Sequence, residues 1–536
     1  MELVLDTNRL DVGDAGVKEF FWPLGRKEQQ AQRDTTLEQL AALIRSGLRS
    51  EDEDCRILGM CFHWLLAESI AMYRATALAR RANEAGVPIK PQEGGRLQAS
   101  VMAGLVPDVT RSRFAQMLRS GPQGHRKFLR PLVKLRRSLD WNGPSVRSFL
   151  PVNTYREIVA CHRTPLLDRH ARLESRYVKQ TLFDEWFDPV LEEPQAPAIN
   201  SALIDACVAS IERGYMAGGE QLPVSQAEYF RSFLKFVTRY VRHHYLPLMS
   251  HRRALPKTLW TGTGGYIYAR MLRNAVQAGG GYVVGHEHGA GEAHIAYFSA
   301  KTLIEYESAD EFVTYCWEGA DALANTFNPS WHVHDRRPRI VSIGERDNTK
   351  APSCPARWIQ PNKIKRVMYP TTALLGERVT LDHFVGDYVY VDWAARLVSR
   401  LGQHRYRVIH KPHPGGDNRF PSGFARRLGA VQSNKPFEQA LGEADAFVLD
   451  FARSTTFPVA LATNKPIVYI DFGLERWHPQ ARALLERRVR VVKGWIDDHN
   501  RFQVDWDDLA NAMSDACELT DRSIVHHYYR DIRIGA

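Results

Sequence analysis

Lys411 and His413 are two residues apart, and both carry side chains that can bind an anion. They follow a β-branched stretch, residues 406–410, that Pro412 and Pro414 bring to an end, as at the C-terminal end of a strand. A lysine offers a point charge, and a histidine donates one hydrogen bond when neutral and two when charged. The pair therefore suits an anionic ligand such as a phosphate.

A cluster of hydroxyl side chains follows a second apolar stretch. Residues 446–451 have the pattern of a buried strand, and Ser454, Thr455 and Thr456 come next, ahead of an apolar run that is typical of a helix. Free backbone N–H groups and the dipole at a helix N-terminus favour an anion, and the hydroxyls add neutral donors. A plain N-cap is the alternative role for the hydroxyls, as a plain turn is for His413.

Parallel strands must position these two groups. Residues 366–370 and 467–471 are further β-rich stretches, so strands alternate with helices here, which is the pattern of a parallel sheet. The carboxyl ends of parallel strands share one edge of a sheet, and ligands bind in the crevice outside that edge. We therefore expect Lys411, His413 and the hydroxyl cluster to form one site for the phosphate of a leaving group.

Taken together, motifs in this region resemble bacterial GT-B transferases that build surface polymers. This broad group holds CDP-glycerol glycerophosphotransferases, capsule Kdo transferases and bacterial sialyltransferases. The resemblance covers residues 260–475 and is carried by Lys411-Pro412-His413-Pro414, Asp450, Ser454-Thr455-Thr456, Ala460, Lys465-Pro466 and Asp471. It implies that the His-Pro and Ser/Thr motifs hold the phosphate of a cytidine nucleotide. It also places Thr371 and Thr372 at the domain interface, beside the donor.

The catalytic base is expected on a turn earlier in the chain. Residues 257–260 and 282–284 are predicted strands on either side of a helix. In the resembling families a His-Gly after an N-domain strand supplies the base, and His288-Gly289 is similar to it. A base near working pH is needed because an acceptor hydroxyl has a pKa far above neutral. Glu292 and His286 are rival bases, and a structural turn is the alternative role for His288.

No metal or other cofactor is expected. His286, His288 and His294 lie close together in the sequence, but without a thiol or a regular helical spacing. No Asp-x-Asp follows a strand in the cleft region, so positive charge is expected to help the nucleotide leave. The Gly-rich residues 261–265 fit neither a Walker motif nor the dinucleotide spacing.

The predicted fold class is α/β and GT-B-like, with two Rossmann-like domains facing a cleft and a helical N-terminal elaboration. A capping box at Thr35 and Glu38 predicts one helix start, and a longer helix is predicted from about 55 to 83, with Gly86 as its C-cap. The acceptor-side domain is predicted to consist of a helical N-terminal region (1–250) and a Rossmann-like core (251–345). A linker (346–363) leads to a Rossmann-like nucleotide-donor domain (364–520). A C-terminal tail (521–536) is expected to cross back to the first domain.

Composition bounds the class of protein. Apolar residues make up 44% of the 536 residues and charged residues 25%, which is ordinary for a globular protein. Seven scattered cysteines argue against a disulfide framework, and the chain has no apolar run long enough to cross a bilayer and no signal-peptide pattern at its start. The cytoplasm is the expected location, with peripheral contact at the inner face of the membrane as a further expectation.

The net charge of +10 points to an anionic partner, and much of the excess lies between Arg111 and Arg147. Nucleic acid is not expected, since the patch holds no recognisable module and few aromatic residues. An anionic lipid or charged polymer surface and a merely solvated helix face stay open as its roles. If nucleic acid did bind here, binding would depend steeply on salt.

The sequence therefore predicts a glycosyltransferase that moves a CMP-activated acidic sugar, such as Kdo or a sialic-acid-like sugar, onto a surface polysaccharide (capsule or lipopolysaccharide) or a glycolipid. Two alternatives stay open. One is a transferase of CDP-glycerol or another CDP-linked alcohol, and the other is a non-catalytic GT-B-like binding or scaffold protein.

Overall fold

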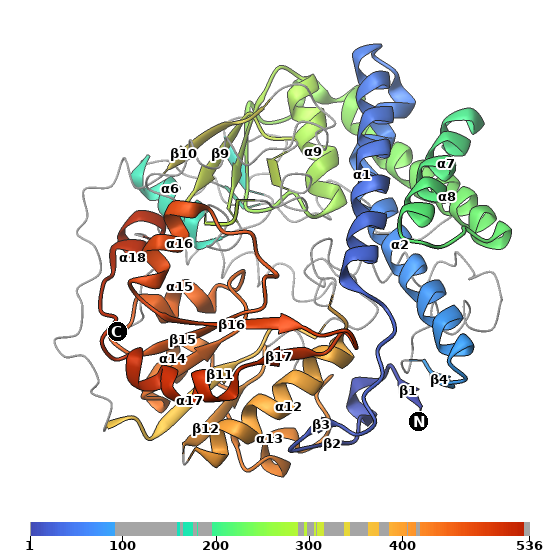
Figure 1. The fold of residues 1–536 in the computed structure, drawn as a ribbon. Coiled ribbons are helices and arrows are strands. Elements are labelled where there is room, and N and C mark those ends of the chain that lie inside the picture. Colours follow the sequence, from blue (N-terminus) through green and yellow to red (C-terminus); the bar gives the residue numbers. More distant parts are fainter. Residues whose placement is uncertain are drawn as a thin grey trace, which may run out of the picture.

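The computed structural model places two parallel β-sheets in one chain, beside a layer of long helices (Figure 1). It describes residues 2–91, 158–160, 164–174, 179–180, 196–287, 294–296, 305–306, 308–315, 337–342, 363–374, 385–404, 406–413 and 419–529. The basic stretch 111–147, His288, Glu292 and nearly all of the predicted linker lie outside these residues.

The first sheet has six parallel strands in the order β10-β9-β8-β7-β5-β6. Its elements along the chain are β5 (Ile158–Ala160), α6 (Pro165–Leu173), β6 (Lys179–Gln180), β7 (Thr258–Thr261), α9 (Ile267–Ala278), β8 (Tyr282–His286), β9 (Glu311–Thr314) and β10 (Arg339–Ser342). β6 lies outside β5, and β7 lies on the other side of β5, so strand order reverses between β5 and β7. This is the doubly wound arrangement of flavodoxin-like sheets.

This sheet begins earlier in the chain than residue 251, where the sequence predicted the first Rossmann-like core to start. β5 pairs with β7 in parallel, and Ile158 lies opposite Thr258. Two strands of the sheet therefore come from the region that was predicted to be mainly helical. They are three and two residues long, which is too short for a period-two pattern to be visible in the sequence.

The second sheet has the order β13-β12-β11-β14-β15-β16-β17, in which all strands but the last are parallel. Its strands are β11 (Arg366–Pro370), β12 (Arg407–Lys411), β13 (Val431–Gln432), β14 (Ala446–Leu449), β15 (Ile467–Asp471), β16 (Arg490–Ile496) and β17 (Phe502–Val504). Read from β11, the first six strands have the Rossmann order 3-2-1-4-5-6. The predicted strands at 366–370 and 467–471 are confirmed.

Helices cover both faces of the second sheet. In β14, Ala446 and Val448 join an apolar cluster with α12 (Asp387–Gln403) and α17 (Trp506–Asp515), while Phe447 and Leu449 join a second cluster. That second cluster holds residues of α14 (Phe437–Ala440), α15 (Thr456–Leu461), α16 (Pro479–Glu486) and α18 (Ser523–Tyr528). Strands buried on both faces read as continuous apolar runs, which explains why the sequence pattern marked them clearly.

The helical layer consists of α1 (Arg26–Arg49), α2 (Glu53–Glu84), α7 (Ser201–Ala217) and α8 (Val224–Ser250). The predicted helix at about 55–83 is confirmed as α2, and Gly86 follows it with φ +67°. The helix predicted to start at Thr35 starts at Arg26 instead. The Glu28 carboxylate accepts a hydrogen bond from the Gly25 N–H (3.0 Å), which caps that earlier start.

α2 is long and apolar enough to span a membrane by length and composition, and it is the one such helix among the described residues. Of its apolar window, 78% is buried inside the protein. It packs against α1, α7, α8 and α9, as a core helix does.

Residues 2–25 lie against the second sheet's α12, although the sequence placed them with the acceptor-side domain. They hold β1 (Leu3–Val4), β2 (Val12–Gly13) and β3 (Gly16–Val17), and we call them the N-terminal arm. The Val17 N–H donates to the Asp392 carboxylate (2.8 Å), and Trp22 stacks on Tyr388 of α12. In Figure 1 the arm (blue) runs from the first residue of α1 to α12 (orange). The arm thus joins the helical layer to the domain that holds the second sheet.

The predicted tail holds a short helix, α18, which packs on α16 with Ile524 fully buried. One residue beyond that helix, the Tyr529 hydroxyl and the His294 Nδ1 share a hydrogen bond (2.5 Å). Tyr306 and Phe312, on the side of the first sheet, belong to the same apolar cluster as α18. The end of the described chain therefore contacts both halves of the molecule.

Candidate functional site

Strand order in the second sheet reverses between β11 and β14, and β12 lies on the other side of β11. Thr371 and Thr372 follow β11, Lys411 is the last residue of β12 with His413 two residues later, and Ser454 to Thr456 come after β14. All three strands are parallel, so their carboxyl ends share one edge, at the topological switch point. We call this edge the donor-side site.

Backbone pairing fixes the ends of β11 and β12 to each other. Pro370 lies opposite Lys411, and the Thr371 N–H donates to the Lys411 carbonyl (3.0 Å). The Thr371 Oγ1 is buried and makes no hydrogen bond to any residue that the structure describes, which leaves a donor for a ligand at the switch point. The Thr372 N–H donates to the Tyr390 hydroxyl (3.4 Å) instead.

Asp450, directly after β14, is a buried carboxylate that clamps the site from behind. It accepts hydrogen bonds from the hydroxyls of Tyr369 (2.5 Å) and Tyr390 (2.6 Å) and from the indole N–H of Trp393 (2.9 Å). Burial raises the pKa of Asp450, and the three donors oppose that shift. Because all its partners are protein groups, Asp450 positions the ends of β11 and β14 and does not face a ligand.

The three hydrogen-bond partners of Asp450 could not be predicted from the motif that contains Asp450. Tyr390 and Trp393 are three residues apart on α12, so they lie on one helix face. Their spacing was the one feature of the sequence that indicated a shared partner. Tyr369 lies on β11, next to β14 in the sheet. Only the pairing of the two strands brings it to Asp450.

Lys411 is buried and His413 is half-buried. The Lys411 ammonium donates to the Pro412 carbonyl (3.1 Å), and burial lowers its pKa, while Glu438 and Glu443 act in the opposite direction. Burial, and then the charge of Lys411, lowers the pKa of His413. His413 is therefore neutral near pH 7, with one ring N–H to donate.

The hydroxyl cluster is arranged differently from the prediction. α15 begins at Thr456 and spans six residues, so its dipole is small. The Ser454 Oγ accepts from the Thr456 N–H (3.2 Å) and shares a hydrogen bond with the Thr456 Oγ1 (2.5 Å). Ser454 thus caps the turn, while Thr455 is exposed at the same edge. Thr455 is the N-cap residue of α15, but its side chain makes no capping hydrogen bond, so its hydroxyl is the accessible one.

Arg453 is a charged residue at this edge that the sequence reasoning missed. Its guanidinium donates to the Glu475 carboxylate (2.5 Å), which comes from the loop after β15. The side chain is 13% exposed, and its charge helps to lower the pKa of His294, although burial is the main cause. Arg453 thus adds positive charge beside the hydroxyl cluster, partly balanced by Glu475.

At the first sheet, the structure corrects one rival base. His286 is fully buried at the end of β8, where its Nδ1 lies 3.2 Å from the Thr261 carbonyl and its Nε2 lies 3.1 Å from His170 Nδ1. The Nδ1–H therefore donates to the carbonyl, and Nε2 accepts from His170. With both ring nitrogens occupied inside the protein, His286 positions the turn and cannot receive a proton from an acceptor.

His288 and Glu292 lie outside the described residues, but both ends of their segment are fixed. Glu287, just before it, accepts hydrogen bonds from the Thr314 hydroxyl (2.6 Å) and the Tyr315 N–H (2.9 Å). His294, just after it, stacks on Trp477 of the donor side, with ring centroids 4.7 Å apart. The His294 carbonyl also accepts from the His478 N–H (2.8 Å). Glu287 is thus fixed on the first sheet, and His294 on the domain that carries the hydroxyl cluster.

The Gly-rich loop after β7 is filled by a protein carboxylate. Glu305 accepts from the Thr263 hydroxyl (2.7 Å) and the Gly264 N–H (2.8 Å). The loop has a structural partner, in agreement with its lack of a phosphate-binding motif. Among the residues that the structure describes, no three His, Cys, Asp or Glu side chains gather as a metal site would require. Metal independence stays a prediction.

Comparison with known proteins adds the following. No protein family model and no curated protein sequence matches the chain. Among solved structures it is similar to UGT2 of Phytolacca americana, complexed with UDP-2fluoro-glucose and pterostilbene, at 11% identity and a TM-score of 0.30, over 70% of this chain and 93% of that chain. It is also similar to the glycosyltransferase VinC in complex with dTDP, at 12% identity and a TM-score of 0.30, over 70% of this chain and 95% of that chain.

At this identity and TM-score the likeness carries no conclusion about activity or substrate. The fold class rests on the sheets themselves: two Rossmann-like parallel sheets, each with a topological switch point, and a helical N-terminal elaboration. The predicted α/β, GT-B-like fold class is confirmed as an arrangement of sheets and helices.

Proposed function

We propose that the protein is a glycosyltransferase that uses a nucleotide-activated sugar, with a CMP-activated acidic sugar such as Kdo or a sialic-acid-like sugar as donor. The observation that supports this most is the meeting of three polar loops at the switch point between β11, β12 and β14. Nucleotides bind at such points in Rossmann-type sheets. The preference for cytidine rests on the His-Pro and Ser/Thr motifs described above.

In this proposal the donor phosphate lies among His413, Thr455 and the free Thr371 hydroxyl, with Thr372 and Ser454 shaping the loops around it. Neutral His413 donates one hydrogen bond to a phosphate oxygen. Lys411 and Arg453 supply positive charge from behind as the nucleotide leaves, which stabilises developing negative charge without a metal. Thr456 helps to shape this turn, since its N–H donates to the Ser454 hydroxyl.

The acceptor is proposed to be a surface polysaccharide or glycolipid, and His288 to be the base that deprotonates its hydroxyl, with Glu292 as the second candidate. This assignment is supported by the two ends of segment 288–293, since Glu287 is fixed on the first sheet and His294 on the donor side. The site of action would be the cytoplasm, at the inner face of the membrane.

Donor turnover tests the proposal. Purified protein is incubated with CMP-Kdo, a CMP-sialic acid and CDP-glycerol, with and without acceptor, and CMP release and product are measured. We expect release from a CMP-sugar to fall about a hundredfold or more in His288→Ala, as when a general base is lost. His404→Ala is the matched control, because His404 is an exposed histidine at the end of α12.

The three outcomes separate the proposal from its alternatives. Turnover of CDP-glycerol alone, with a phosphodiester product, would replace the sugar donor by a CDP-linked alcohol. Absence of turnover with every donor, or full activity in both His288→Ala and His413→Ala, would contradict an enzymatic role and favour a binding or scaffold protein.

A further inference from the structure

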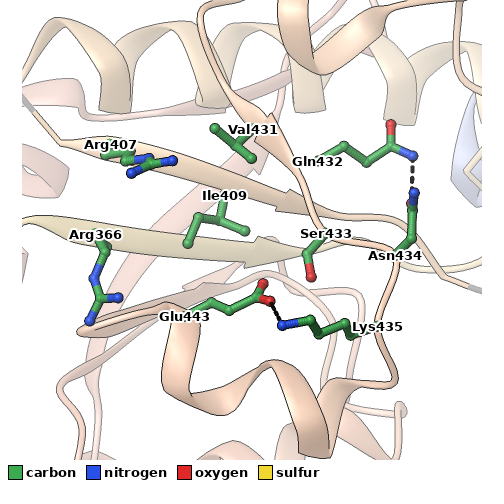
Figure 2. Close-up of a pocket in the computed structure, with 9 residues that line it drawn as sticks. All are labelled: Arg366, Arg407, Ile409, Val431, Gln432, Ser433, Asn434, Lys435 and Glu443. Atoms are coloured by element: carbon green, nitrogen blue, oxygen red, sulfur yellow. Dashed lines mark hydrogen bonds and ion pairs between the residues drawn. The ribbon is translucent and has the colours of Figure 1, made fainter.

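A separate pocket lies on one face of the second sheet, beside its edge strand β13 (Figure 2). Its volume is about 550 Å³, within the range of roughly 300–1,000 Å³ that is usual for small-molecule sites. The lining residues are Arg366, Arg407, Ile409, Val431, Gln432, Ser433, Asn434, Lys435 and Glu443. None of them belongs to the donor-side site.

The pocket is at a different place on the sheet from the donor-side site. Arg366 and Arg407 are the first residues of β11 and β12, and they lie opposite each other in the register. The donor-side residues of the same two strands lie at or after their last residues, Pro370 and Lys411. Since all three loops of the donor-side site leave from the carboxyl edge, a ligand over Arg407 sits toward the opposite, amino edge.

The charges in the pocket leave one cation unpaired. Arg366 forms an ion pair with Asp445 (2.7 Å), and Lys435 forms one with Glu443 (2.7 Å). Arg407 is exposed and has no ion-pair or hydrogen-bond partner for its guanidinium within the described chain. A planar guanidinium binds a carboxylate or phosphate through two parallel hydrogen bonds. The pocket is therefore suited to one anionic group.

The rim of the pocket is polar. Ser433 is only 5% exposed, and its backbone N–H is fixed on the His410 carbonyl (2.9 Å). Hydrogen bonds from Lys435 and from the Ser433 hydroxyl lower the pKa of Glu443, so this hydroxyl faces a carboxylate of the protein. Beside it the amides of Gln432 and Asn434 bond each other (2.8 Å) and leave further donors and acceptors at the rim.

The floor of the pocket is apolar. Ile409 of β12 and Val431 of β13 face it, and Val431 is 44% exposed, which is unusual for a β-branched strand residue beside a sheet core. Covering such a surface with the body of a ligand removes apolar area from water. The site therefore combines one cation, a buried hydroxyl and a small apolar surface.

We propose that this pocket is a second ligand site, which takes a small molecule with one carboxylate or phosphate group and an apolar body. The anionic group lies against Arg407, and the body covers Ile409 and Val431. This site does not depend on the glycosyltransferase proposal, since it uses none of the same side chains.

Direct binding of phenyl phosphate, benzoate and inorganic phosphate to the full chain tests this site, by calorimetry at constant ionic strength. We expect phenyl phosphate and benzoate to bind and inorganic phosphate to bind more weakly, because it has no apolar body. Arg407→Gln should weaken phenyl phosphate about tenfold or more, as expected for a lost charge-assisted contact. Ser433→Ala should weaken it less.

Two controls keep the result interpretable. Arg427→Gln removes another exposed arginine of the same domain, on α13 (Phe424–Arg427), and should bind as the unaltered protein does. His413→Ala should also keep the binding, because it alters only the donor-side site. Equal binding by Arg407→Gln and the unaltered protein, or no binding of either aromatic anion, would overturn the proposal. Loss of binding in His413→Ala alone would show that the anion binds at the donor-side site, and this result would also overturn the proposal.

Discussion

At the scale of single residues, the proposed donor-side site depends on a side chain whose partners are all protein groups. Asp450 accepts three hydrogen bonds and fixes the ends of β11 and β14, where the proposal places the donor phosphate. A carboxylate with this many donors is costly to replace, since each donor that loses its acceptor stays buried.

Asp450→Asn is expected to lower the free energy of unfolding by about 1–3 kcal/mol, because an amide N–H₂ group then faces a hydroxyl or indole donor. Urea titration measures the change. Asp498→Asn, an exposed carboxylate between β16 and β17, should have little effect. An Asp450→Asn variant as stable as the unaltered protein would show that the clamp does not hold the strand ends.

His410 gives a prediction for pH. It is buried against Phe420 and Phe424, and neither ring nitrogen has a hydrogen-bond partner in the described part of the chain. Burial lowers its pKa to about 3, with Lys411 acting in the same direction. In the unfolded chain the pKa is about 6.5. Between pH 3 and pH 6.5 the unfolded chain binds a proton at this histidine and the folded protein does not. The free energy of unfolding therefore falls as the pH falls from about 6.5 toward 3, by up to about 1.4 kcal/mol per pH unit.

His410→Leu should remove this contribution, so that the free energy of unfolding falls less steeply on acidification. At neutral pH the variant should be as stable or more stable, because two unpartnered nitrogens are lost. Denaturant titrations across the pH series measure both effects, with exposed His404→Leu as the control. An unchanged slope would mean that the imidazole of His410 is protonated in the folded state.

At the scale of elements, the sequence predicted those elements whose signals are local. α2 and the strands of the second sheet carry long apolar patterns or clear stops, and both were found. α1 was predicted to start at Thr35 because its first turns bury polar residues, Gln29, Gln32 and Arg33, which hide the helical period. The short strands β5 and β6 depend on pairing with β7 and with each other, and no local pattern reveals them.

The N-terminal arm gives the element-scale prediction. Asp392 of α12 is fully buried and accepts hydrogen bonds from the Val17 N–H and from the guanidinium groups of Arg396 and Arg501. Asp392→Asn leaves two arginines without their carboxylate, which should cost about 3–5 kcal/mol and loosen the arm. Limited proteolysis and urea titration report the two effects. Asp14→Asn, an exposed carboxylate of the same arm, is the control.

Resistance of the arm to protease in Asp392→Asn, at the level of the Asp14→Asn control, would contradict this account of how the arm is held. The sequence could not have predicted the contact. Val17 and Asp392 are 375 positions apart, and neither lies in a pattern that indicates the other.

At the scale of the whole molecule, contacts between distant described residues hold the two halves together. They include the arm on α12, the contact between His294 and Trp477, and Tyr529 just after α18. The candidate site residues of the second sheet could be predicted because each follows a recognisable strand. Their true roles could not, since whether Ser454 faces a ligand or caps a turn depends on one side-chain rotation.

The most direct test of the account is whether the donor-side site binds a cytidine nucleotide. The thermal midpoint of the purified protein is measured with CMP, CDP, UMP, UDP, GDP and dTDP, for the unaltered chain, His413→Ala and His404→Ala. A nucleotide that binds only the folded state adds about 2.7 kcal/mol at a hundredfold excess over its dissociation constant. We predict that CMP or CDP raises the midpoint, that His413→Ala removes this rise and that His404→Ala keeps it. If no nucleotide raises the midpoint, or if His413→Ala responds like the unaltered protein, the switch point of the second sheet is not a nucleotide site.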